Sequence, residues 1–224
     1  LKLIPTEETI IKNDFINNLS VSQNNLYFLN TYGSLYSIEV RNKRISWFIN
    51  LNQSLELNPS NLFFGNQVVL DKNKIVISSS NFTYVLEKNN GAIIYKKNFS
   101  SIIKPIINND YLFLLTKNYY LIAMNLKNGE ILFSYDINNK IANFLETKKN
   151  IAQFQSMAII NSGILIFLKN SYVLQLNING KIQRIAKLPS KMRTFPIFIS
   201  AQVSQAQIIW GNVAAATVIQ SIPP

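Results

Sequence analysis

Four windows of fifteen residues repeat one pattern along this chain, and they align with one another without a gap. Each window reads as an apolar strand, a short polar break and a second strand in which apolar and polar residues alternate. Every break carries Gly or Asn, as at Gly33 and Asn81, and these residues tolerate the positive φ that a tight hairpin demands. Each window is therefore predicted to form a β-hairpin. The windows are residues 26–40, 74–88, 112–126 and 164–178.

The same series of positions closes each window and continues past it, which predicts a third strand. An acid or amide near the window's end is interpreted as a turn acceptor for backbone N–H groups. A turn residue follows it, and the residue four positions beyond the turn is aromatic in three units, where we expect it to pack between sheets. The acids and amides are Glu39, Glu87, Asn125 and Asn177, the turn residues are Lys43, Gly91, Gly129 and Gly180, and the later residues are Trp47, Tyr95, Phe133 and Arg184. Among these last four, we expect Phe133 to be buried and Arg184 to be exposed.

A further strand is expected before each window, at residues 15–21, 67–70, 106–107 and 157–160. Four strands joined by tight turns make one antiparallel sheet. The acid or amide position recurs at spacings of 48, 38 and 52 residues, and four-stranded propeller blades recur at about 40–50 residues. The prediction is an all-β protein, a β-propeller with at least four blades, in which only residues 141–155 suggest a helical turn or two.

The repeat resembles that of the PQQ-like propeller family, in which an apolar strand, a turn, L-Y-A-L-D, T-G and an aromatic residue follow one another. Residues 26–49 and 112–135 match best, through LYSIEV, LIAMNL and KNGEILFSY, and the resemblance covers about 24–188. Lys43 and Arg184 depart from the pattern, because one replaces the turn glycine and the other the aromatic residue. The resemblance implies that these blades are part of a larger or incompletely covered propeller.

Composition removes much of the catalytic repertoire. The chain has no Cys and no His, so no thiolate nucleophile, His general base or Cys/His metal site is available from it. Glu39 and Glu87 could be imagined as a carboxylate pair, but the repeat places them in different blades. The glycines lie outside the phosphate-binding motifs. We therefore expect no catalytic residue, no cofactor site and no metal site.

The resemblance extends to function through the family's non-enzymatic, BamB-like branch, which serves outer-membrane β-barrel assembly. It implies a protein-binding scaffold in the periplasm, at the outer membrane, whose partners are other proteins. That branch consists of lipoproteins, which need an N-terminal Cys, so either a preceding segment carries it or this member is not lipidated. Two alternatives stay open: a structural subunit of a large viral or cellular assembly, and a relative of the quinoprotein dehydrogenases.

The charge of the chain bears on its partners. The formal net charge is +11, but the 18 Lys residues are scattered and accompany 31 Asn residues, a bias typical of AT-rich coding sequences. A nucleic-acid footprint would cluster Lys and Arg on one element, so nucleic acid is not an expected partner. The scattered charge favours acidic proteins or lipid head groups, and hence peripheral association with a membrane. Lys140, Lys148 and Lys149, in a stretch read as a loop, are the candidate partner-facing residues.

The last 24 residues differ from the rest. Residues 201–224 carry no charge, and Gly211-Asn212 lies between apolar runs as a two-residue hairpin turn would. We therefore divide the chain into propeller blades over residues 1–200 and a hairpin or tail over residues 201–224. We expect no signal peptide within residues 1–11, which lack a basic segment followed by an apolar one, and a leader removed before Leu1 stays open.

Overall fold

A computed structural model describes residues 18–52, 63–79, 81–145, 153–160, 163–189, 197–199 and 207–209. The chain divides into two compact units, Leu1–Ser134 and Tyr135–Pro224, and each is considered by itself. Among the described residues, no helix has the length and apolar character that crossing a membrane requires.

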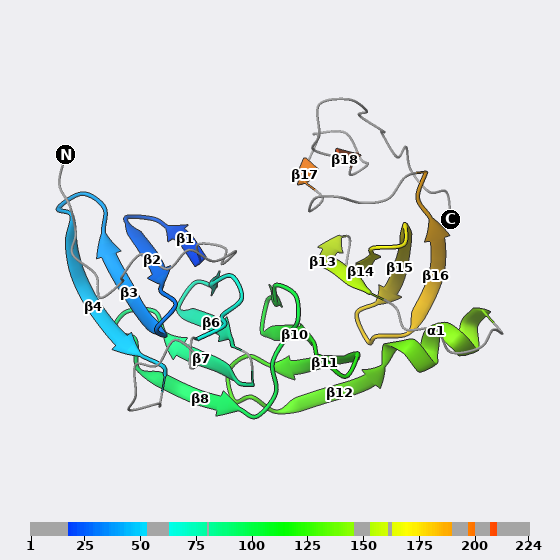
Figure 1. Ribbon diagram of the computed structural model, residues 1–224, viewed down its shortest axis with the longest axis horizontal. Helices are drawn as coiled ribbons and strands as arrows, with labels where there is room; N and C mark the ends of the chain where they lie inside the picture. The colour runs from blue at the N-terminus through cyan, green and yellow to red at the C-terminus, as the bar shows by residue number, and fades with distance from the viewer. Residues whose placement is uncertain are drawn as a thin grey trace. The chain divides into compact units, whose positions relative to one another are not determined.

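Four antiparallel sheets of four strands each dominate the structure, as the repeat predicts (Figure 1). Strands follow the chain order within every sheet, because each tight turn places the next strand beside the last. We call the sheets blades 1 to 4. Blade 1 is β1 (Asn18–Ser22), β2 (Asn25–Leu29), β3 (Ser34–Glu39) and β4 (Arg44–Asn50); blade 2 is β5 (Val69–Leu70), β6 (Lys74–Ser78), β7 (Thr83–Glu87) and β8 (Ile93–Lys97). Blade 3 is β9 (Ile106–Asn108), β10 (Tyr111–Leu115), β11 (Tyr120–Asn125) and β12 (Ile131–Asp136); blade 4 is β13 (Phe154–Ile160), β14 (Gly163–Leu168), β15 (Tyr172–Asn177) and β16 (Ile182–Lys187).

The alignment without a gap is wrong at one place, the first strand of the second window. Leu26 pairs with Ile38 in blade 1, whereas Lys74, its counterpart in the alignment, pairs with Glu87 in blade 2. The hairpin loop of blade 2 is therefore one residue shorter, and Ile75 occupies the place of Leu26. Because a shift of one residue exchanges the two faces of a strand, this register directs Ile75 and Ile77 toward blade 1 and Val76 toward blade 3.

The turn that follows each window has a positive φ in all four blades. Gly91, Gly129 and Gly180 have φ values of 75°, 71° and 79°, and Lys43 keeps the same left-handed backbone at 53°. Glycine adopts this conformation freely, whereas a lysine adopts it at a cost of roughly 1 kcal/mol. The turn geometry therefore persists in blade 1 without the glycine.

Two apolar cores lie between the sheets of the first unit. Tyr27, Leu29 and Leu35 of blade 1 pack against Ile75, Ile77, Tyr84 and Leu86 of blade 2. The opposite face of blade 2 packs its Val69, Val76 and Val85 against blade 3 residues that include Leu112, Leu114, Ile122 and Met124. Alternating residues of a strand point to opposite faces, so blade 2 is apolar on both faces. In the second unit, Ala158, Phe167 and Leu188 form a smaller core.

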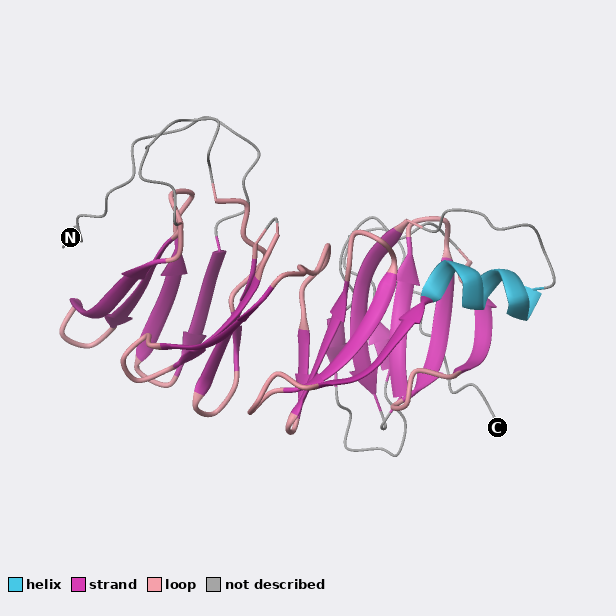
Figure 2. Cartoon of the chain, turned by 90° about the horizontal axis from the view of Figure 1, so that it is seen from below, coloured by secondary structure: helices cyan, strands magenta, loops and turns pink. Residues whose placement is uncertain are grey.

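The helix differs from its predicted position. α1 (Ile137–Leu145) follows β12 directly, as Figure 2 shows, whereas a helical turn was expected over residues 141–155. The Asp136 carboxylate accepts a hydrogen bond of 3.0 Å from the Asn139 amide and so caps the first turn. Residues 137–140 are thus helical, and the loop reading of this stretch is wrong there.

Only two short strands are described near the end of the chain. β17 (Ile197–Ile199) pairs antiparallel with β18 (Gln207–Ile209). The predicted Gly211-Asn212 turn lies outside the described residues. A boundary at residue 200 would separate these two paired strands, and the division into 1–200 and 201–224 stays a prediction.

Candidate protein-binding surface

In three blades a β-bulge precedes the residue that lies four positions beyond the predicted turn. In blades 1, 2 and 4 the pairing between the third and fourth strands shifts by one residue immediately before Trp47, Tyr95 and Arg184. A bulge twists a strand and redirects its side chains. The same device thus orients the same repeat position in three blades.

Trp47 and Tyr95 each rest on a glycine of the following blade. A Cβ built on Gly91 would lie 2.6 Å from Trp47 ring carbons, and one built on Gly129 would lie 2.9 Å from the Tyr95 ring. The Tyr95 hydroxyl also donates to the Leu126 carbonyl at 2.9 Å, and burial raises the pKa of Tyr95 to about 12. These contacts link blade 1 to blade 2 and blade 2 to blade 3.

Phe133 and Arg184 lie differently. Phe133 is half-buried rather than buried, and its ring centroid is 6.5 Å from that of Phe113 on the same sheet. Arg184 is exposed. Packing of Phe133 between two sheets stays a prediction.

The aligned acids and amides lie at the same end of four different sheets. The main-chain carbonyls of Glu87, Asn125 and Asn177 accept hydrogen bonds of 2.8–2.9 Å from the N–H groups of the turn glycines. The side chains of Asn125 and Asn177 also accept from the backbone, at the Lys127 and Lys181 amides, while Glu39 accepts from Asn24 at 3.4 Å. Within the described residues, no three acidic side chains gather closely enough to hold a metal ion.

The candidate partner-facing lysines are only partly described. Lys140 is exposed on α1, not on a loop, and its ammonium lies 5.1 Å from the Tyr135 ring centroid. Lys148 and Lys149 lie outside the described residues. Their role at a partner surface stays a prediction.

Blade 1 presents an apolar surface on the side opposite blade 2, which we call the Phe48 face. It consists of two cross-strand rows, Leu19–Phe28–Tyr36–Phe48 and Val21–Leu26–Ile38–Ile45. The rings of Phe28, Tyr36 and Phe48 stack at centroid distances of 6.3 and 5.7 Å. Tyr36 and Ile38 are buried, but Leu19, Val21 and Phe48 are 49%, 66% and 59% exposed.

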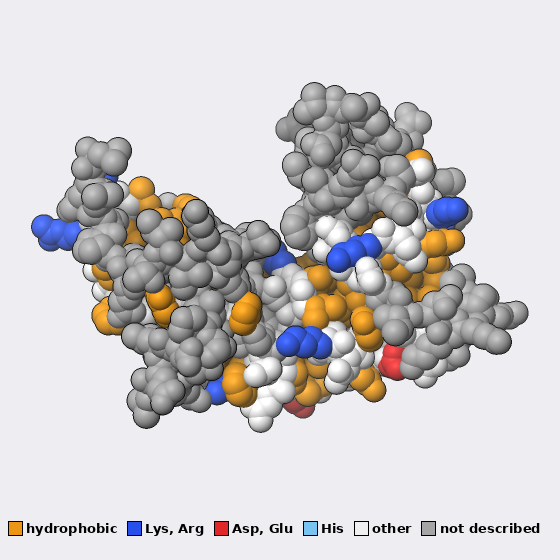
Figure 3. All heavy atoms as spheres, in the orientation of Figure 1, with side chains coloured by type: hydrophobic (Ala, Val, Ile, Leu, Met, Phe, Trp, Pro, Cys, Tyr) orange, Lys and Arg blue, Asp and Glu red, His pale blue; other side chains and the backbone are white. Residues whose placement is uncertain are grey.

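The matching positions in the next blades are covered. The pair that corresponds to Phe28 and Tyr36 is Ile77 and Tyr84 in blade 2, and Leu114 and Ile122 in blade 3. All four of these side chains are buried against the preceding blade. Figure 3 shows hydrophobic side chains reaching the surface among scattered Lys and Arg side chains. The Phe48 face thus has the apolar composition of a sheet face that another sheet covers, although its outer residues are exposed.

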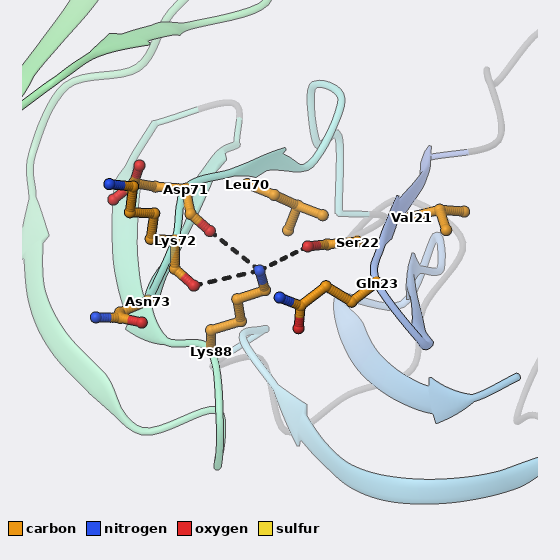
Figure 4. A pocket seen from close by; sticks show the side chains of 8 residues that line it. All are labelled: Val21, Ser22, Gln23, Leu70, Asp71, Lys72, Asn73 and Lys88. Atoms are coloured by element: carbon orange, nitrogen blue, oxygen red, sulfur yellow. Dashed lines mark hydrogen bonds between the residues drawn. The ribbon is translucent and has the colours of Figure 1, made fainter.

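A pocket of about 530 Å³ opens between blades 1 and 2 (Figure 4). It is lined by Val21, Ser22, Gln23, Leu70, Asp71, Lys72, Asn73 and Lys88. The Lys88 ammonium donates to Ser22 Oγ at 2.7 Å and to the carbonyl oxygens of Asp71 and Lys72 at 3.1 and 3.3 Å. Sequence reasoning missed this site, although the windows carry its signal: they end in Val40, Lys88, Leu126 and Ile178, one lysine among apolar residues.

Comparison with protein families gives one match. A family model described as Outer membrane protein assembly factor BamB matches residues 56–220. No curated protein matches the sequence. The family match therefore extends over blades 2 to 4 and most of the segment that follows them.

Solved structures share the propeller fold. BamB from Moraxella catarrhalis is 12% identical, with a TM-score of 0.52 over 86% of this chain and 66% of that one. The computationally designed Ika8 protein is 10% identical, with a TM-score of 0.61 over 85% and 54%. A quinohemoprotein alcohol dehydrogenase from Comamonas testosteroni is 9% identical, with a TM-score of 0.65 over 86% and 39%. The chain spans less than two thirds of each, and the likeness shows that its four sheets are blades of a β-propeller.

Proposed function

The chain belongs to the BamB family of outer membrane protein assembly factors, and from that membership we propose that it is a non-catalytic, protein-binding scaffold in outer-membrane β-barrel assembly. The proposal places it in the periplasm, at the outer membrane, with the β-barrel assembly machinery as its partner. The absence of Cys and His from the chain agrees with a role that needs no nucleophile or general base.

The observation that carries the proposal is the Phe48 face. Contiguous apolar side chains exposed on a folded surface mark interaction sites. Because another antiparallel sheet covers the same positions in blades 2 and 3, the occupant that fits is a β-sheet face with alternating aliphatic and aromatic side chains.

Lys43 bears on whether this occupant is a further blade that docks by an aromatic residue. Gly91 and Gly129 make room for the ring of the preceding blade, whereas Lys43 carries a side chain at that position. A preceding blade could not place its aromatic residue there in the same way. We therefore propose a sheet of another protein as the occupant, and cross-links from the Phe48 face to the chain itself would instead identify a further blade.

Capture from membranes tests the proposal. The purified chain is immobilised, exposed to detergent-solubilised outer membranes of its own organism, and the retained proteins are identified by mass spectrometry. We expect the β-barrel assembly machinery to be retained, and Leu19→Asp or Phe48→Asp to reduce its recovery about tenfold, as at interface hot spots. Ile131→Asp is the matched control, because Ile131 of blade 3 is 48% exposed and Leu19 is 49% exposed.

Three results would contradict the proposal. Equal recovery with the Leu19 and Phe48 variants would exclude the Phe48 face. Isolation of the chain in a stoichiometric particle without the assembly machinery would favour a structural subunit. Dye reduction that depends on added quinone and calcium would show that the protein is an enzyme.

A further inference from the structure

Lys88 interrupts an apolar column of the repeat. Its counterpart in blade 3, Leu126, is only 2% exposed and belongs to the core between blades 2 and 3. The backbone is the same at both places, since the Lys88 and Leu126 amides donate to equivalent carbonyls, those of Asn73 and Asp110. The lysine thus replaces apolar packing between two blades with a cation.

The acceptors that hold this cation are neutral. They are one hydroxyl and two backbone carbonyls, contributed by Ser22 of blade 1 and by the turn between β5 and β6. No ion pair to Lys88 is present among the described residues, and in Figure 4 the Asp71 carboxylate points away from the ammonium. Within the described part of the chain, the positive charge is therefore held by neutral dipoles and has no counter-charge.

The rest of the pocket supplies donors and an apolar wall. Ser22 Oγ accepts from Lys88, so its own O–H proton is directed elsewhere and can be donated to a ligand. The Gln23 carboxamide lies beside the Lys88 ammonium, and the Leu70 side chain borders the same space. The pocket is open to solvent, so a group at the end or on the side of a polypeptide could enter it.

We propose that this pocket binds a carboxylate joined to an aliphatic group, as a polypeptide of the assembly machinery or its client would present it. The inference rests on the proposed scaffold function and names the chemistry of one contact within it. The carboxylate supplies the missing counter-charge to Lys88 and accepts hydrogen bonds from Ser22 and Gln23. Charge-assisted hydrogen bonds are about twice as strong as neutral ones. The aliphatic group contacts Leu70.

Titration followed by amide NMR tests the assignment on the whole chain. The probes are N-acetyl-leucine, its uncharged analogue N-acetyl-leucinamide, and the α-amide of N-acetylglutamate, whose carboxylate is on the side chain. We expect saturable shifts at the Ser22, Gln23 and Lys88 amides with N-acetyl-leucine and none with N-acetyl-leucinamide. The affinity of the glutamate derivative, compared with that of N-acetyl-leucine, shows whether the pocket prefers the carboxylate of a chain terminus or of an acidic side chain.

Two lysine variants provide the control. Lys88→Met is expected to weaken binding of N-acetyl-leucine at least about tenfold, the effect of losing one charge-assisted contact. Lys127→Met removes the same charge from an exposed lysine that pairs with Asp110 at 2.8 Å, and should leave binding unchanged. Ser22→Ala keeps the Lys88 charge and should weaken binding less than Lys88→Met does.

Equal shifts with the amide, unchanged binding by the Lys88 variant, or no binding at all would each overturn the assignment. Membrane capture of the assembly machinery is read separately. If capture persists while the titration fails, the pocket assignment alone is wrong. If the titration succeeds while capture fails, the pocket assignment holds and the proposed scaffold function is wrong.

Discussion

Single residues decide how neighbouring blades meet. Gly91 lies beneath the Trp47 ring, at a φ of 75° and with no space for a Cβ. Lys43 stands at the same turn position of blade 1 with a φ of 53°, and its exposed side chain shows that the turn itself does not require glycine. The requirement at Gly91 therefore comes from the neighbouring ring as well as from the backbone.

Exchanging these two turn residues separates the two causes. Gly91→Ala should lower the free energy of unfolding by about 2–4 kcal/mol, because the new methyl group overlaps the Trp47 ring and the left-handed backbone is strained. Lys43→Gly changes the same turn where no ring approaches, and should shift stability by at most about 1 kcal/mol in either direction. Urea unfolding of both variants measures the difference. Equal effects would show that the ring contact contributes nothing.

Elements were largely predictable from the sequence, because period-2 alternation and turn residues are local signals. All four hairpins and both flanking strands of each blade lie within a few residues of their expected places. The shorter loop of blade 2 was not predictable from the windows, since only cross-strand pairing reveals the register. The pocket around Lys88 was also missed: the windows show one lysine among apolar end residues, but only the structure shows that this lysine contacts Ser22 of the neighbouring blade.

Tyr95 joins β8 to the turn that follows β11, and its ionisation should report on that contact. Burial raises its folded-state pKa from 10.0 to about 12. Below pH 10 both states hold the phenolic proton, so stability is unaffected. Between about pH 10 and 12 the unfolded chain loses the proton first, so stability should fall as pH rises.

The Tyr95→Phe variant isolates this contribution. It should show a shallower loss of stability above pH 10, and a cost of about 1 kcal/mol at neutral pH from the lost hydrogen bond to Leu126. Tyr27 and Tyr84, whose pKa values burial also raises, should leave a residual slope. Urea midpoints between pH 7 and 11.5 give the measurement. If stability falls with pH equally steeply in the variant and the natural chain, the pKa of Tyr95 is the same in the folded and the unfolded state.

The whole molecule combines a propeller of the BamB family with an apolar sheet face and scattered positive charge. One described ion pair, Lys127–Asp110, accompanies a formal net charge of +11. Such a charge attracts acidic partners and anionic lipid head groups over a range that salt shortens. In the proposed scaffold function, the apolar face would supply the contact area with the partner, and the positive charge would supply the long-range attraction to it.

Site-specific photo-cross-linking tests this account most directly. A benzophenone amino acid placed at position 48, and in a control chain at position 131, is activated by light in cells of the protein's own organism. The account predicts that position 48 cross-links to a component of the β-barrel assembly machinery and that position 131 does not. Cross-links from position 48 that reach only the chain itself, or only proteins outside the cell envelope, would contradict it.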